Sequence, residues 1–97
     1  MGEQAKKVAA LMGLLSNEHR LLILCSLLDG PKTAGDLGSC VPDISGPALS
    51  QHLHRLRDAG LIKSDKKAQF VWYSLADERL RELMDLLKRN YCSDAVE

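Results

Sequence analysis

The side chains that offer most chemistry in this chain are six hydrogen-bonding groups close together near its middle: Ser50, Gln51, His52, His54, Arg55 and Arg57. Hydroxyl, amide, imidazole and guanidinium groups of this kind bind base edges and phosphates in nucleic acids. Interleaved with them, apolar residues recur at the spacing of a buried helical stripe: Leu49, Leu53, Leu56 and Ala59. The segment is therefore predicted to be an amphipathic helix with one face suited to DNA.

The ends of this helix are marked by local signals. Ser45 can cap its first turn, Pro47 suits that turn because no N–H is needed there, and Gly60 ends it. The alternative is an ordinary solvated helix, although such a helix more often carries Glu and Lys four residues apart. The charge distribution favours the first interpretation.

The net charge of the chain is zero, which by itself argues against a nucleic acid partner. However, residues 51–73 carry five Lys/Arg against two Asp/Glu, while residues 1–50 carry four against five and residues 74–97 four against six. The positive charge is thus concentrated in the segment that already suggests DNA binding.

Apolar periodicity predicts a first helix over 5–15 and a buried second helix over 18–28, capped by Ser16-Asn17. A third helix begins at Thr33, with Asp36 as a weak capping-box partner, and a turn follows over 40–44. Two short helices joined by a turn, the second polar on one side, form a helix-turn-helix.

The pattern then changes to that of β-strands. Runs at 61–64 and 70–75 flank a charged tip over 65–69 and predict a hairpin, with Val71, Tyr73 and Leu75 facing the core and Phe70 and Trp72 opposite. A helix-turn-helix followed by a basic hairpin is a winged helix-turn-helix. The predicted fold class is therefore mainly α with a small β-hairpin.

Asp77 is expected to cap a fifth and last helix over 78–91. A domain of 97 residues with few aromatic side chains has a modest core, so the apolar faces of the first and last helices are expected to pair in a homodimer. Such a dimer sets two DNA-reading helices roughly 34 Å apart on one side of a duplex. The whole of 1–97 is predicted to be one domain, with residues 1–4 and 93–97 flexible.

The candidate DNA contacts come from this helix and from the hairpin. Gln51 and His52 are the best candidates for base contacts, since Gln suits adenine and His can donate to guanine. The remaining candidates are expected to contact phosphates, neighbouring groups or the minor groove: Ser45, Ala48, Ser50, His54, Arg55, Lys66, Lys67 and Gln69.

Several other functions find no support in the residues. The three histidines have no Ser or Cys nucleophile with an acid partner, and no phosphate-binding glycine loop occurs, so an enzyme is not expected. No cofactor is expected. No apolar run approaches the roughly 20 residues of a membrane span and no signal-peptide pattern is present, so a cytoplasmic location is expected. A winged helix that binds protein instead of DNA remains the alternative.

The order of elements resembles that of the ArsR family of bacterial repressors over roughly residues 8–92. The specific blocks are Asn17-Glu18-His19-Arg20-Leu21, Ala48-Leu49-Ser50-Gln51-His52-Leu53, Ala59-Gly60-Leu61 and Tyr73-Ser74-Leu75. Within the family, Leu24-Cys25, Lys67-Ala68-Gln69 and Tyr91-Cys92 look most like the branch that contains HlyU, SqrR and BigR. Two departures are a turn over 40–44 that is one residue longer and Cys40, which has no counterpart.

This resemblance implies a dimeric repressor of operator DNA that senses reactive sulfur or oxidants through Cys25 and Cys92. Oxidation or persulfide attack followed by bridging would tie the last helix to the domain body. Lys88 and Arg89 are placed to favour a thiolate at Cys92. Two metal sites found in the family lack their ligands here, because 33–37 has no cysteine and 77–97 no histidine. Release by a thiophilic ion such as arsenite remains the alternative, and buried cysteines also act as simple apolar fillers.

Overall fold

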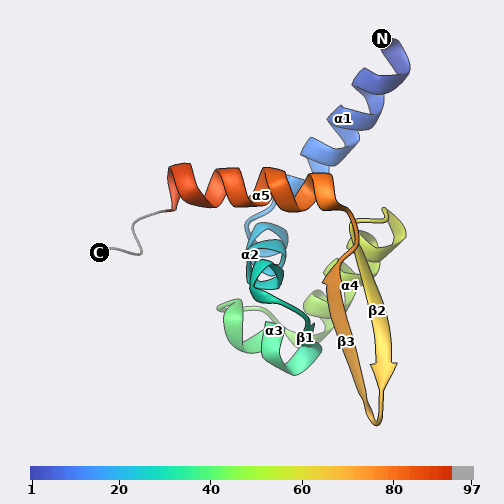
Figure 1. Ribbon diagram of the computed structural model, residues 1–97. Helices are drawn as coiled ribbons and strands as arrows, with labels where there is room; N and C mark the ends of the chain where they lie inside the picture. The colour runs from blue at the N-terminus through green and yellow to red at the C-terminus, as the bar shows by residue number, and fades with distance from the viewer. Residues whose placement is uncertain (93–97) are drawn as a thin grey trace.

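The structure, a computed structural model, describes residues 1–92. They form five α-helices, a short 3-10 helix and a three-stranded antiparallel sheet (Figure 1). In chain order the elements are α1 (Gly2–Leu15), α2 (Glu18–Ser26), η1 (Leu27–Asp29), β1 (Lys32–Thr33), α3 (Ala34–Cys40), α4 (Gly46–Asp58), β2 (Ile62–Lys67), β3 (Phe70–Leu75) and α5 (Glu78–Tyr91). The predicted winged helix-turn-helix is confirmed, with α3 and α4 as its two helices and the β2–β3 hairpin as its wing.

Four helices begin at the capping residues predicted from sequence. The side chains of Asn17, Ser45 and Asp77 each accept a hydrogen bond from a backbone N–H in the first turn of the following helix. Thr33 and Asp36 form a complete capping box before α3. These starts depend on neighbouring residues alone, which explains why the sequence predicted them well.

The first part of the chain differs from prediction in two helix boundaries and one additional strand. Helix α1 begins at Gly2, so it includes residues that the predicted helix over 5–15 left out. Helix α2 ends at Ser26, and the chain tightens into η1 before Gly30. Strand β1 was not predicted, because two residues show no periodicity. It exists only through its antiparallel pairing with β3, which sets Lys32 opposite Tyr73.

The wing is longer than predicted and its tip is shorter. Asp65, Lys66 and Lys67 were assigned to the tip, but they continue β2 and pair with β3. Only two residues connect the strands, and the first of them, Ala68, has a φ of 58°. Leu75 is buried and Tyr73 half-buried as predicted. Val71 is 40% exposed, contrary to prediction, because this part of the hairpin extends past the core.

The core lies among α2, α3, α4, α5 and the start of the wing. Its buried members are mostly leucine, and three of the four predicted stripe residues of α4 belong to it: Leu49, Leu53 and Leu56. Ala59 is exposed, contrary to prediction, because α4 ends at Asp58 and the chain turns there. The same packing leaves the opposite face of α4 on the surface.

Helix α1 extends away from the rest of the molecule, and α5 crosses above α2 (Figure 1). Large apolar side chains on these two helices lie open to solvent: Val8, Met12 and Leu86. Over the described residues, no single helix has the length and apolar character to cross a membrane. The α1 segment and Glu18–Asp29 meet that criterion only as a pair bent by 92°.

Candidate nucleic-acid interface and thiol pair

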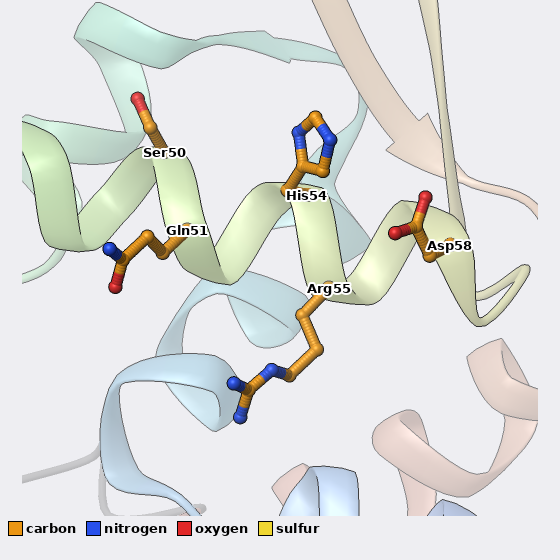
Figure 2. Close-up of a pocket in the computed structure, with 5 residues that line it drawn as sticks. All are labelled: Ser50, Gln51, His54, Arg55 and Asp58. Carbon is orange, nitrogen blue, oxygen red and sulfur yellow. The ribbon is translucent and has the colours of Figure 1, made fainter.

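The outward face of α4 carries a shallow depression of about 610 Å³. Its lining side chains are Ser50, Gln51, His54, Arg55 and Asp58. Figure 2 shows Ser50 and His54 along one edge of the helix and Gln51 and Arg55 along the other. These four predicted contact residues therefore share one accessible surface that offers hydroxyl, amide, imidazole and guanidinium groups.

His52 lies elsewhere. It was predicted to contact bases with Gln51, but the structure turns it toward α2, where its Nδ1 lies 3.4 Å from Nη1 of Arg20. The His52 ring also meets His19 edge to face, with 5.9 Å between ring centroids. Burial, together with the charges of Arg20, His19 and Arg55, lowers the pKa of His52 below its ordinary value. His52 is therefore half-buried and contacts α2, whereas Gln51 lines the exposed depression.

The other predicted contact residues lie around this face. Ser45 uses its side chain to cap α4, and Ala48 is half-buried in the first turn. Lys66, Lys67 and Gln69 form a separate exposed group at the far end of the wing. The structure thus brings the predicted contacts together as two groups, one on α4 and one on the wing.

Two further residues of α4 have roles that sequence reasoning did not assign. Arg57 donates a hydrogen bond to Ser64 Oγ at 3.3 Å and so connects α4 to β2. Asp58 lines the depression beside His54 and Arg55. Asp58 follows His54 by four residues, and residues at that spacing share a helix face. This spacing could have predicted that Asp58 lies on the same surface as His54.

The basic side chains of this surface keep their charge available. Among residues 1–92, the four ion pairs lie on α1, on α5 and at the start of α5. Arg55, Lys66 and Lys67 take part in none of them. When a lysine or arginine side chain neutralises a DNA phosphate, the counterions condensed on that phosphate are released, which favours binding.

A second cavity, of about 410 Å³, lies between α2 and α5. Cys25 from α2 and Cys92, directly after α5, both line it, in a mostly apolar wall that includes Leu21, Leu87 and Tyr91. Both cysteines are free thiols. The fold therefore brings together two residues that are 67 positions apart in the sequence.

The two thiols have different surroundings. Burial raises the pKa of Cys25, the charge of Cys92 raises it further, and Lys88 offsets part of this rise. Cys92 is exposed. Lys88 lines the cavity, whereas Arg89 pairs with Asp85 at 3.2 Å and does not line it. Cys40 is exposed at the end of α3 and does not line the cavity that Cys25 and Cys92 share.

Within the part of the chain that the structure describes, no three His, Cys, Asp or Glu side chains converge as metal ligands would. A hard or borderline ion needs several such ligands.

A helix-turn-helix with an exposed polar second helix and a basic wing defines the class of winged helix-turn-helix DNA-binding proteins. The family model of the bacterial regulatory proteins of the arsR family matches residues 17–64. The chain is 41% identical to the transcriptional activator HlyU of Vibrio cholerae over 95% of its own length and 84% of that protein. It is also 41% identical to the regulator YgaV of Escherichia coli, over 91% of this chain and 89% of that protein.

Solved structures agree with the sequence matches. Reduced HlyU from Vibrio cholerae superposes with a TM-score of 0.87 over 95% of this chain and 96% of that one. The transcriptional repressor BigR from Xylella fastidiosa, 30% identical, superposes with a TM-score of 0.84 over 95% of this chain and 93% of that one. The chain belongs to the ArsR family and is a transcriptional regulator.

Proposed function

We propose that this protein is a homodimeric repressor whose affinity for operator DNA is switched by chemistry at Cys25 and Cys92. The observation that supports this most is that both cysteines line the single cavity between α2 and α5. A bridge across that cavity would tie α5 to the body that carries α4. The cytoplasm, expected from the sequence, is the proposed location.

The proposed DNA contacts follow the two exposed groups. Gln51 and Ser50 contact base edges. His54 and Arg55 contact phosphates, or lie between the bases and the phosphates. Ser45 and Ala48 bring the start of α4 close to the backbone, where the helix N-terminus favours a phosphate. Lys66, Lys67 and Gln69 contact the neighbouring backbone or minor groove.

The proposed dimer forms through α1 and α5. Val8, which is 54% exposed, and Leu11 lie with Leu80 and Leu83 along a groove of about 390 Å³, whose rim also carries Lys7, Asp77 and Arg79. A second copy of this chain has the same faces to bury, as expected for a two-fold interface. A winged helix-turn-helix domain of a possible ArsR-family regulator from Mycobacterium bovis is described as homodimeric.

In the proposed switch, Cys92 reacts first because it is exposed and Lys88 is near. Its thiolate attacks the outer sulfur of a persulfide RSSH, so that Cys92 becomes a persulfide and RS⁻ leaves. Cys25, the more shielded thiol, loses its proton and attacks the Cys92 sulfur, and HS⁻ leaves as the disulfide forms. A hydroperoxide gives the same bridge through a sulfenic acid at Cys92, with an alcohol and then water leaving.

The test measures DNA affinity by fluorescence anisotropy before and after treatment with inorganic polysulfide. The unmodified protein is expected to lose about tenfold or more in affinity and to recover it with a reductant. Cys25→Ser and Cys92→Ser proteins should not respond, whereas Cys40→Ser, the matched control, should respond fully. If either serine variant of the pair loses DNA binding as the unmodified protein does, the switch is refuted.

Two alternatives give different results in the same experiment. Arsenite held by Cys25 and Cys92 would weaken DNA binding without any change in sulfur oxidation state, which mass spectrometry distinguishes. Arsenite is the second candidate inducer because Cys25 and Cys92, two thiol ligands, line the same cavity. A protein-binding module would show no shift with the protein's own upstream DNA at any oxidation state.

A further inference from the structure

Arg20 is the one charged residue that is buried among the described residues, with 8% of its surface exposed. Its Nε donates to the carbonyl oxygen of Leu14 at 2.7 Å, and its Nη2 donates to that of Gly13 at 3.4 Å. Both carbonyls belong to the last turn of α1, where a helix leaves acceptors without partners in the helix itself. Arg20 therefore fastens the end of α1 to α2.

The same guanidinium reaches α4. Its Nη1 lies 3.4 Å from Nδ1 of His52. Arginine has no acceptor, so the imidazole must accept this hydrogen bond, which requires a neutral His52 with its proton on Nε2. One side chain thus contacts the end of α1, belongs to α2 and touches the helix that carries the proposed DNA contacts.

We propose that Arg20 is a positioning residue that, through His52, couples the orientation of α4 to the end of α1. The proposal rests on the proposed DNA-binding function, and it makes the contact sensitive to protonation of His52. The titratable groups that face His52 are Arg20 and His19 from α2 and Arg55 from α4, and each of them is or can become positive. A proton on His52 therefore removes the acceptor and places two cations in contact.

The direction of the pH effect follows from these surroundings. Burial first, then the charges of Arg20, His19 and Arg55, lower the pKa of His52. The neutral form and its contact with Arg20 are therefore present at neutral pH and above. The contact opens as the pH falls through the lowered pKa, below the ordinary value of about 6.5. Positioning of α4 should loosen under acid conditions only.

The experiment compares DNA affinity of the unmodified protein and His52→Gln between about pH 8 and about pH 5. Glutamine offers an acceptor to Arg20 and does not titrate. At about pH 8 we expect the two proteins to bind DNA with similar affinity. At about pH 5 the unmodified protein should bind about three- to tenfold more weakly than His52→Gln. His54 is present in both proteins, so its contribution cancels in the ratio.

A second pair of variants separates positioning from folding. Arg20→Lys keeps the charge but loses the planar fork of donors. Its affinity should therefore be lower than that of the unmodified protein where His52 is neutral, should approach it under acid conditions, and should be nearly insensitive to a further His52→Gln change. Among the charges near His52, that of Arg20 lowers its pKa most. Arg20→Met removes this charge and should therefore raise the pKa of His52, as measured by an NMR titration. An affinity ratio that stays flat with pH, or an unaltered His52 titration, overturns the inference. If the unmodified protein binds no duplex DNA at any pH, the proposed function fails as well.

Discussion

At the scale of single residues, neighbours on α4 have opposite surroundings. Gln51 and His54 line the exposed depression, while His52 between them is held against Arg20. A helix turns about 100° per residue, so adjacent side chains of a half-buried helix diverge in this way. Base recognition is therefore expected from Gln51 and Ser50, without His52.

Replacing Gln51 with alanine tests this assignment. A bidentate glutamine–adenine contact discriminates by about 1–3 kcal/mol, so Gln51→Ala should lose up to that amount on operator DNA and almost nothing on random DNA. Parallel anisotropy titrations with the two duplexes measure the difference. Equal losses on both duplexes would contradict a base contact at Gln51.

Leu56 tests the core beneath the same helix. Its side chain is fully buried, and Leu56→Ala is expected to lower the free energy of unfolding by about 2–5 kcal/mol, because transfer and cavity terms add. Urea unfolding followed by circular dichroism measures this change. Val71→Ala, at a site 40% exposed on β3, is the control and should cost much less.

At the scale of elements, the wing acts as a separate basic arm. Its strands carry Lys66 and Lys67 past the core, where neither residue is buried nor in an ion pair. A contact between such lysines and phosphates carries no base information. The wing is therefore expected to set affinity, and α4 to set sequence choice.

Changing Lys66 and Lys67 together to glutamine should weaken binding about equally on operator and random DNA. Each lost phosphate contact should also lower the slope of log affinity against log salt by about one. Titrations at several salt concentrations give that slope. Lys6→Gln on α1 is the control and should leave the slope unchanged. If the double variant of Lys66 and Lys67 also left the slope unchanged, the wing would not contact phosphates.

At the scale of the whole molecule, α1 has little to pack against within one chain. Its residues are almost all exposed, yet Val8, Leu11 and Met12 are apolar. Exposed apolar side chains of this kind along one element indicate an interface. The proposed homodimer buries them and also determines how far apart the two α4 helices lie.

Val8→Glu is predicted to shift the protein toward monomers, since a carboxylate would be buried at the centre of the proposed interface. Light scattering during size exclusion at micromolar concentration should show the change, together with weaker DNA binding. Val71→Glu, at an exposed apolar site on β3, serves as the control for association and should remain dimeric. A monomeric unmodified protein would refute the dimer.

The features that the sequence predicted are those that depend on nearby residues. The capping box of Thr33 and Asp36, the leucine stripe of α4 and the two long strands each follow from propensity and periodicity within one segment. The class of fold and the exposed group of Ser50, Gln51, His54 and Arg55 follow in turn from those local signals.

The features that the sequence did not predict needed partners from distant segments. Strand β1 exists through its pairing with β3, and the contact of His52 with Arg20 joins α4 to α2 across 32 positions of the sequence. Arg20 itself could have been suspected, as a single arginine at the start of an apolar helix.

By its own local pattern, then, the sequence determined the helices, the wing and the polar face of α4. The tertiary structure decided which thiols share a cavity, which histidine supports α4 and where the cations remain unpaired. The physical reason is distance. Periodicity and capping act within about one or two helical turns, whereas the pKa of a thiol and the burial of an imidazole depend on whatever residues the fold places around them.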